Sequence, residues 1–433
     1  MSVLGERPRV PHTPLWTLKA CQLLAAASWS CIARFLNVFF SDIGVTRSEI
    51  GILSMATMIA AFFGQLFWSM VTTHLGEYMR ILVGTGFAGT CLVFFYLLPE
   101  VQVSFWCLAL VCVVSFSFLS TGRVIVDAMC LSVVQEQKCE EHYGHQRLWY
   151  AIGCGGMSLL GGHLMDVFGS GFMFWSFAAI QSAFIAVCLV YLPTQKKPLS
   201  SATQEQATLT LKQFLNFDVM WFFADLMIYG LAMSLVESLL LVYLNEDFEQ
   251  PPKLLLGAAV AVMCAFEIPV FKYIDRILGQ RKERLTSVLM ATKLLLAVRC
   301  FLCAALPPSK PWLVLLIQPL HGLTFAAMWS ANVEYCQEIA PAGCGSLMFV
   351  LACGIYSQVA IGTGTAMWGH LAMEPPNGLG FRRCFHLATM LVLLWALIWQ
   401  LGILIRRRLR TAETAEELQV LPVSPEEGSD IVF

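Results

Sequence analysis

The sequence has few charged residues. Only 13% of its 433 residues are Asp, Glu, Lys or Arg, and 58% are hydrophobic, whereas soluble domains have about 25% and about 45–50%. This deficit excludes a chain whose whole surface faces water. The formal net charge of -2 and the lack of a basic tract interleaved with aromatic residues give no sign of nucleic-acid binding. We therefore expect lipid to be the main solvent.

The sequence also lacks the common catalytic motifs. It contains no His-Glu-x-x-His pair for zinc, no P-loop for nucleotide and no Gly-x-Ser-x-Gly elbow. These gaps argue against an intramembrane enzyme, and we expect neither a metal nor a cofactor. Most of the sixteen cysteines lie inside apolar runs, where they behave as small hydrophobic residues. The first thirteen residues do not resemble a cleaved signal peptide, so we expect the first span to be retained.

Long apolar runs predict twelve membrane-spanning helices. A span needs about 20 apolar residues, because about 30 Å of hydrocarbon is crossed at about 1.5 Å per residue. The runs cover residues 15–40, 50–71, 79–98, 103–134, 147–167, 171–192, 214–244, 254–274, 285–306, 311–339, 345–373 and 384–405. We predict an all-α membrane protein with twelve transmembrane helices in two pseudo-symmetric six-helix bundles. The expected segments are a cytoplasmic N-terminus (1–13), an N-terminal bundle (14–192), a cytoplasmic linker (193–212), a C-terminal bundle (213–406) and a disordered acidic cytoplasmic tail (407–433).

Basic residues are distributed unequally between the two ends of the predicted spans. With the N-terminus in the cytoplasm, eighteen of the 27 Lys and Arg residues fall on the cytoplasmic side, five fall on the opposite side and four lie within spans. The positive-inside rule therefore places both termini in the cytoplasm. The sequence leaves open whether the membrane is the plasma membrane or that of an organelle. We expect a monomer in the bilayer.

An internal repeat supports two related halves. The segment FGQLFWSMVTTHLGEYMR, which begins at Phe63, aligns with FEIPVFKYIDRILGQRKE, which begins at Phe266, at an offset of 203 residues. Each segment holds the end of one span, a short loop with Leu-Gly and the start of the next span. The offset is nearly half of the chain, as expected for two similar bundles. The fifth and eleventh spans are rich in glycine, so we expect them to pack closely near the interface of the halves.

Ionisable residues lie inside the predicted spans, and they indicate a functional interior. They are Arg34, Arg123, Asp127, Asp225, Glu237, Glu267, Lys293, Arg299 and Glu334, together with His321. Nine unpaired charges would cost roughly 20–30 kcal/mol, more than the about 5–15 kcal/mol that keeps a typical protein folded, so they must be paired, neutralised or hydrated. Arg123 and Asp127 are four residues apart and can form a local pair. Arg34 lies near a span end and is expected to extend toward the membrane surface.

Four segments resemble one transporter family. They are TGRVIVDA (121–128), YGHQRLWYAIG (143–153), AVRCFL (297–302) and QPLHGLTF (318–325). They are similar to the major facilitator superfamily, in the branch that contains lactose and sucrose permeases and related proton symporters, and the resemblance covers residues 15–405. It implies a secondary transporter of a small polar solute, sugar- or nucleoside-like, that alternates access between two halves. Coupling to protons stays open.

The resemblance also implies roles for single residues. The expected solute contacts are Asp127, Arg147, Trp149, Arg123 and Trp329. The expected proton-coupling residues are Arg299, His321 and Glu237 by resemblance, with Glu267 and Glu334 as the other available carboxylates. The expected gate residues are Gly76, Arg80, Asp275, Arg276, Gly279 and Arg281. Two departures matter: Cys154 stands where the lactose permease stacks a tryptophan on its sugar, and Thr324 stands where it carries its proton-binding glutamate. A galactoside is therefore not expected, and another carboxylate would have to bind the proton.

Two other functions stay open on the sequence alone. The chain could be a facilitative uniporter, or a non-transporting membrane receptor or scaffold on the same fold. The altered first gate motif, with Thr72, Thr73 and Glu77 where an acid and bases are usual, favours these alternatives. Uptake with and without a pH gradient separates them.

Overall fold

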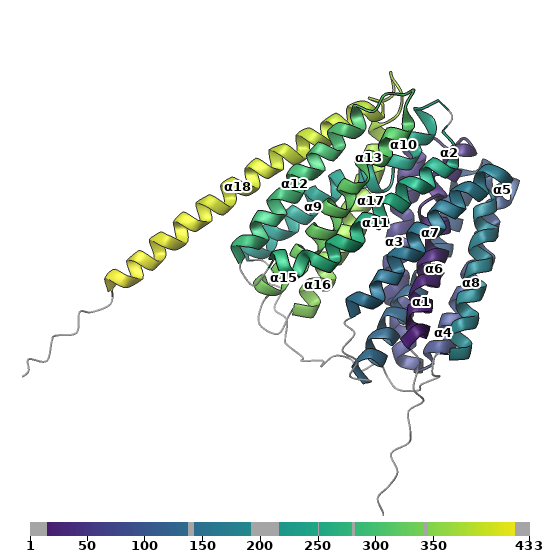
Figure 1. Cartoon of the computed structure of the whole chain (residues 1–433), viewed down its shortest axis with the longest axis horizontal. Helices are drawn as coiled ribbons and strands as arrows, with labels where there is room; N and C mark the ends of the chain where they lie inside the picture. Colours follow the sequence, from purple (N-terminus) through teal and green to yellow (C-terminus); the bar gives the residue numbers. More distant parts are fainter. Residues whose placement is uncertain are drawn as a thin grey trace, which may run out of the picture.

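The computed structural model describes residues 15–136, 143–191, 216–249, 251–278, 282–340 and 345–420, and the regular structure in these ranges is helical (Figure 1). The first half contains α1 (Leu15–Ala33), α2 (Leu36–Asp42), α3 (Arg47–Leu75), α4 (Tyr78–Val93), η1 (Phe94–Leu97), α5 (Pro99–Val103), α6 (Phe105–Glu136), α7 (Tyr143–Phe168) and α8 (Phe172–Tyr191). The second half contains α9 (Phe217–Glu237), α10 (Leu240–Glu246), α11 (Lys253–Leu278), α12 (Lys282–Ala304), η3 (Pro311–Leu313), α13 (Val314–Ile317), α14 (Pro319–His321), η4 (Gly322–Ala326), α15 (Ala327–Ile339), α16 (Gly345–Gly354), η5 (Ile355–Ala360), α17 (Ile361–Leu371) and α18 (Phe381–Val420).

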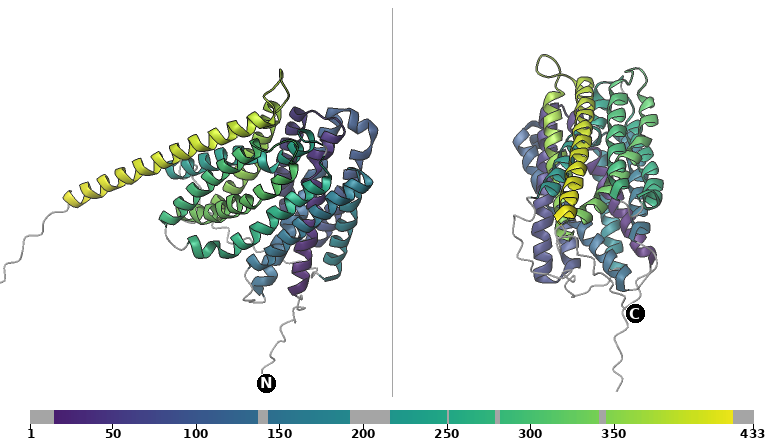
Figure 2. Two further views of the ribbon diagram at one scale, coloured as in Figure 1. Left: turned by 45° about the horizontal axis from the view of Figure 1, so that its top comes forward. Right: turned by 90° about the vertical axis from the view of Figure 1, so that its left-hand side faces the viewer.

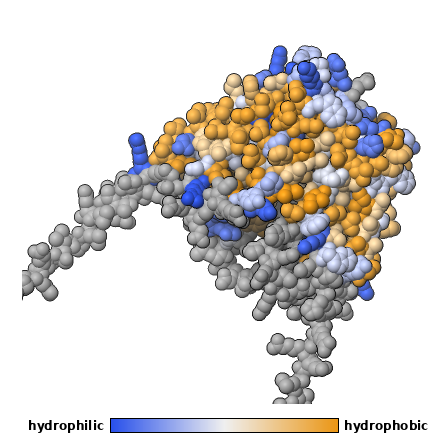
Figure 3. All heavy atoms as spheres, in the orientation of Figure 1, coloured by the Kyte–Doolittle hydropathy of each residue, from blue (hydrophilic) through white to orange (hydrophobic). Residues whose placement is uncertain are grey.

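The helices form the predicted twelve-span arrangement. Within the described residues, eleven segments are long and apolar enough to cross a membrane. The remaining span is α7, which has 26 residues and is rich in glycine. Because α7 packs against α1 and α11, protein covers much of it and it needs less apolar surface than a lipid-facing helix. Apolar residues cover most of the face drawn in Figure 3, and hydrophilic residues gather toward the ends of the helices.

Two spans break at equivalent places in the two halves. The first span stops at Ala33 and resumes at Leu36, and the seventh stops at Glu237 and resumes at Leu240. Both α2 and α10 have seven residues, and each bound of the second pair follows the first by 204 residues. This offset is close to that of the sequence repeat. The structure therefore extends the predicted repeat to a shared local interruption that the sequence did not reveal.

The start of α1 and the end of α18 lie toward one end of the bundle (Figure 2). We call the opposite end, where α2 and α10 finish and α3 and α11 begin, the distal end. Local signals fix the start and the end of α3: Thr46 forms a capping box with Glu49, and Gly76 closes the helix in the left-handed region at a φ of 64°.

Small residues bring the two halves into close contact. Gly155 and Gly162 of α7 lie against the α11 backbone at Ala261 and Lys253. On the other side of the molecule, Gly369 of α17 lies against the backbone of Arg47 on α3. A side chain at any of these glycines would overlap or crowd the facing helix. The predicted close packing of the fifth and eleventh spans at the interface is confirmed.

The last helix is longer than its apolar run. We expected the twelfth span to end near residue 405, but α18 continues to Val420. The added segment, RRRLRTAETAEELQV, is rich in Arg, Ala, Glu and Leu, which favour helix even where no apolar face is available for packing. The rest of the predicted tail, residues 421–433, lies outside the described residues.

Candidate functional site

A chain of hydrogen-bonded polar side chains lies inside the second half. The Arg299 guanidinium on α12 lies 2.7 Å from Nδ1 of His321 on α14 and donates to Oε1 of Gln318 at 3.0 Å. On the other side of the imidazole, Nε2 of His321 lies 3.2 Å from Oε1 of Glu267 on α11. Arg299, His321 and Gln318 are buried, whereas the Glu267 side chain is 13% exposed. Three of the predicted coupling residues are thus brought together.

Chemistry alone decides which atoms donate and which accept in this series of hydrogen bonds. Arginine has no acceptor, so the Arg299 guanidinium must donate and Nδ1 of His321 must accept. In the neutral imidazole the remaining proton is then on Nε2, which donates to Glu267. Glu267 is the acceptor at the end of the series. A proton added to Glu267 would turn one of its acceptor oxygens into a donor. This change would disturb the whole series of hydrogen bonds from Glu267 to Arg299.

An irregular turn positions His321 and Glu267. The residues directly after His321 form the π-helical turn η4, and such turns free backbone carbonyls from the helical ladder. The carbonyl of Thr324 accepts a hydrogen bond from the Tyr229 hydroxyl at 3.0 Å. Gly322, which lacks a side chain, lies against the backbone of α11 at Phe266 and Glu267. This close approach places the Glu267 carboxylate beside the imidazole.

Aromatic rings extend from the histidine along the same helix. His321 stacks on Phe325 with centroids 5.5 Å apart, and Phe325 stacks on Trp329 at 6.1 Å. Trp329 also contacts Tyr356 at 5.8 Å, on the second π-helical turn, η5. Trp329, a predicted solute contact, is half-buried and therefore offers an accessible aromatic surface.

Two oppositely charged residues lie at the broken spans. Arg34 is half-buried in the break between α1 and α2, and Glu237 is half-buried at the end of α9. Arg34 lies within electrostatic range of both Glu237 and Glu267, which belong to the other half. We expected Arg34 to extend toward the membrane surface, but the break in the first span directs it between the halves.

Lys293 belongs to a separate buried ion pair. Its ammonium donates to Oδ2 of Asp225 at 2.9 Å, and both side chains are 3% exposed or less. The indole of Trp395 donates to the other Asp225 oxygen at 2.6 Å, and Lys293 lies 4.4 Å from the Trp399 ring centroid. These residues join α9, α12 and α18. With its hydrogen bonds satisfied, the pair acts as a clamp between three helices.

The other predicted solute contacts lie on two helices of the first half. Arg123 and Asp127 fall on α6 and Arg147 falls on α7, but their side chains lie outside the described part of the structure. Trp149 is half-buried on α7, and Glu334 is half-buried on α15. The solute contacts on α6 and α7 therefore stay predictions.

The predicted gate residues are described in part. Gly76 ends α3, and Arg80 pairs with Glu77 at 2.8 Å on the same turn of α4. The basic residue of the altered motif thus pairs locally with Glu77. Asp275 and Arg276 fall on the last turn of α11 with side chains outside the described part, and Gly279 and Arg281 lie outside the described residues.

Sequence reasoning missed one residue of the site and misplaced another. Gln318 was not singled out, although it lies three residues before His321 and so on the same helical face. Arg34 was placed by its distance from a span end, which takes no account of a broken helix. Gln318 could have been found from its spacing to His321, whereas the position of Arg34 depends on the fold.

Comparisons with known proteins identify relatives of the fold. A family profile described as "MFS_1 like family" matches residues 15–372. The solved structure of the nucleoside transporter NupG is similar with a TM-score of 0.74 at 14% identity, over 89% of this chain and 98% of that one. A POT family transporter in complex with 5-aminolevulinic acid is similar with a TM-score of 0.65 at 12% identity, over 90% and 98%. No curated protein sequence matches the chain significantly.

Proposed function

Because the chain belongs to the MFS_1-like family of the major facilitator superfamily, we propose that it is a secondary transporter that moves a small polar solute by alternating access between its two halves. The observation that carries this proposal is the position of the charged residues. Arg34 of the first half lies at one helix break, Glu237 of the second half lies at the other, and Arg34 is within electrostatic range of both Glu237 and Glu267 of α11. Charges at this depth are costly unless they are paired or hydrated, and a hydrated path between the halves would meet this need.

We take the distal end to face away from the cytoplasm, in keeping with the distribution of basic residues. The halves meet closely at this end, through the glycine contacts near Arg47 and Lys253. The solute would then bind between the halves and be released toward the cytoplasmic side.

Glu267 is the residue best placed to couple transport to protons. Thr324 replaces the glutamate of the lactose permease, but Glu267 already accepts from His321 and is partly exposed. Protonation would remove part of its acceptor capacity and loosen the series that ends at Arg299. Proton binding and a change in helix contacts would thereby be linked.

The solute class is proposed from Trp329 and from the solute contacts that the sequence predicts. Stacking on Trp329 suits a flat or ring-shaped solute, and Asp127 and Arg147 would supply an acceptor and donors for hydroxyl or amide groups. A nucleoside- or sugar-like solute meets both requirements. The similarity to a nucleoside transporter structure is compatible with this class, while the similarity to a structure of the peptide transporter POT makes dipeptides the comparison group.

Uptake into proteoliposomes tests the proposal. Purified protein is assayed with a panel of nucleosides, sugars and dipeptides, with and without an inward pH gradient. We expect saturable uptake of one class, stimulated by the gradient. The variant Glu267→Gln should lose the stimulation, whereas Glu100→Gln, at an exposed position on α5, should keep it. Wild-type uptake whose rate is the same with and without the pH gradient supports a uniporter. Binding of the solute without uptake supports a receptor.

A further inference from the structure

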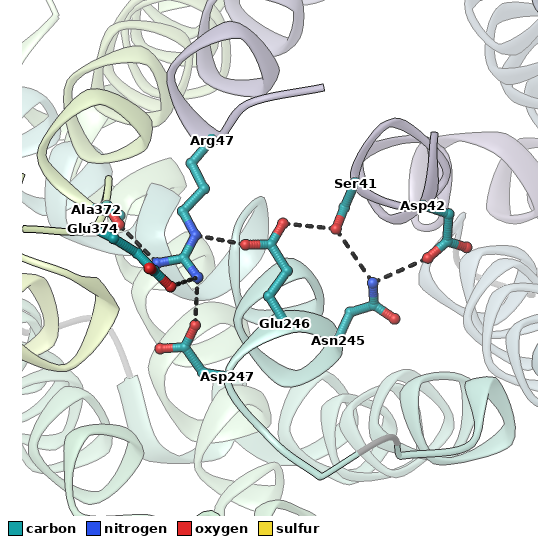
Figure 4. Close-up of polar contacts among 8 residues, drawn as sticks. All are labelled: Ser41, Asp42, Arg47, Asn245, Glu246, Asp247, Ala372 and Glu374. Carbon is teal, nitrogen blue, oxygen red and sulfur yellow. Dashed lines mark hydrogen bonds and ion pairs between the residues drawn. The ribbon is translucent and has the colours of Figure 1, made fainter. Parts of the chain in front are cut away.

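A cluster of charged residues joins the two halves at the distal end (Figure 4). Arg47 begins α3 in the first half, and its side chain is only 10% exposed. Its guanidinium donates to Glu246 at 2.5 Å, to Asp247 at 2.6 Å and to the carbonyl of Ala372 at 2.8 Å. A carboxylate oxygen of Glu374 lies 3.7 Å away. All of these partners belong to the second half.

A second base makes the reverse connection. Lys253 begins α11 in the second half, and its ammonium donates to Asp42 of α2 at 2.6 Å and to Asn245 at 2.5 Å. The amide of Asn245 in turn donates to Asp42 at 3.1 Å. Beside it, the hydroxyl of Ser41 donates to Glu246 at 2.6 Å, which links the two sets (Figure 4).

The two connections are related by the internal repeat. Asp42 and Glu246 are the last residues of α2 and α10, the short helices that follow the two breaks. Arg47 and Lys253 are the first residues of the helices that come next. Each base pairs with the acid of the other half, as symmetry-related partners do across a two-fold axis. Such reciprocity is expected of two repeats that meet face to face.

We propose that these reciprocal pairs, Arg47 with Glu246 and Lys253 with Asp42, form a latch that holds the distal entrance closed and separates when this side opens. The inference rests on the proposed transport function, because a latch matters only in a protein that alternates between two states. The helices of the two halves would part here without any helix having to unfold.

Arg47 is the main element of the latch. Besides its contacts on α10 and after α17, its guanidinium lies 4.5 Å from the ring centroid of Phe381, at the start of α18. One side chain of the first half therefore holds three separate elements of the second. Charge-assisted hydrogen bonds with little exposure to water are stronger than ordinary surface ion pairs. Loss of this side chain should favour opening more than loss of any other single residue in the cluster.

Distance measurements between the halves test the latch. Spin labels are introduced as encoded amino acids at Glu100 and Ser309, both exposed in distal segments of opposite halves, because the chain has sixteen native cysteines. The full-length protein in nanodiscs is compared with the variants Arg47→Gln and Lys253→Gln. The matched control is Arg382→Gln, since Arg382 also lies at the distal end but donates to Leu306 of its own half.

We expect a second, longer distance to appear in both latch variants, with the ratio of open to closed molecules raised about tenfold in Arg47→Gln, which corresponds to about 1.4 kcal/mol. The control should keep the wild-type distribution. Unchanged distances in both latch variants would overturn the proposal; if Arg47→Gln fails to fold, Lys253→Gln alone decides. Uptake by the same preparations is recorded separately. If the variants open but no preparation takes up solute, the latch proposal stands and the transport proposal is refuted.

Discussion

At the scale of single residues, most of the buried charges have partners. Sequence position identified Arg299, His321 and Glu267 as candidates, but it could not order the donors among them, because that order depends on which atoms meet in space. For the same reason it could not separate Lys293, which is enclosed by Asp225 and two tryptophans, from residues that line a path.

The buried pair of Lys293 and Asp225 leads to a stability prediction. Changing only the base, in Lys293→Met, would leave the Asp225 carboxylate buried without its ion partner, which typically costs about 3–5 kcal/mol. Replacing both residues, in the double variant Lys293→Met with Asp225→Leu, removes the uncompensated charge and should recover much of this loss. Unfolding in detergent measures both. Equal stability of the single variant and the wild type would contradict the clamp.

Asp247 leads to a prediction about pH. Burial raises the pKa of this carboxyl above its ordinary value, although Arg47 acts in the opposite direction. The surrounding charged groups are Arg47, Glu246, Glu374, Lys253, Asp42 and the nearby His370. Opening would hydrate Asp247 and bring its pKa back toward the ordinary value of about 3.9. The closed state then binds the proton more tightly, so acid favours closure, and this contribution is lost as pH rises through the raised pKa.

The spin-labelled protein used for the latch measures this effect. The open fraction should rise with pH in the wild type. In Asp247→Asn, which resembles the protonated form, the change with pH should be smaller and the closed state favoured throughout. If the open fraction of Asp247→Asn changes with pH as it does in the wild type, groups other than Asp247 control closure.

At the scale of elements, apolar length predicted the spans well and their interruptions poorly. The runs around residues 15–40 and 214–244 were expected to be continuous, yet each breaks in its last third. The π-helical turns after His321 and Gly354 were also not predicted. Such irregular backbone depends on partners in other helices, such as the Tyr229 hydroxyl on the Thr324 carbonyl, and local sequence does not carry that information.

Glycine contacts between helices can be tested at a single position. A side chain at Gly257 of α11 would overlap the backbone of Ser158 on α7, whereas one at Gly84 of α4 would have open space. We expect Gly257→Ala to lower the free energy of unfolding by about 1–3 kcal/mol, as overpacking generally does. Gly84→Ala should leave it unchanged or slightly higher. Thermal unfolding in detergent compares the two, and equal effects would contradict close packing of α7 on α11.

At the scale of the whole molecule, the repeat explains both the fold and the latch. Two six-helix halves, each with a broken first span, meet distally through small residues and reciprocal ion pairs. Sequence periodicity predicted the halves, and the positions of Gly162 and Gly369 predicted close packing at their interface. It could not predict that Arg47 pairs across the interface whereas Arg80, an expected gate residue, pairs with the nearby Glu77, because the partner of each base depends on the fold.

Counterflow in proteoliposomes tests alternating access most directly. Vesicles are loaded with an excess of the unlabelled solute identified by the uptake panel and are diluted into a trace of the labelled form, with no pH gradient. A carrier that exposes one site to each side in turn should accumulate label transiently above its equilibrium level. Binding of the solute without any such overshoot would contradict the account.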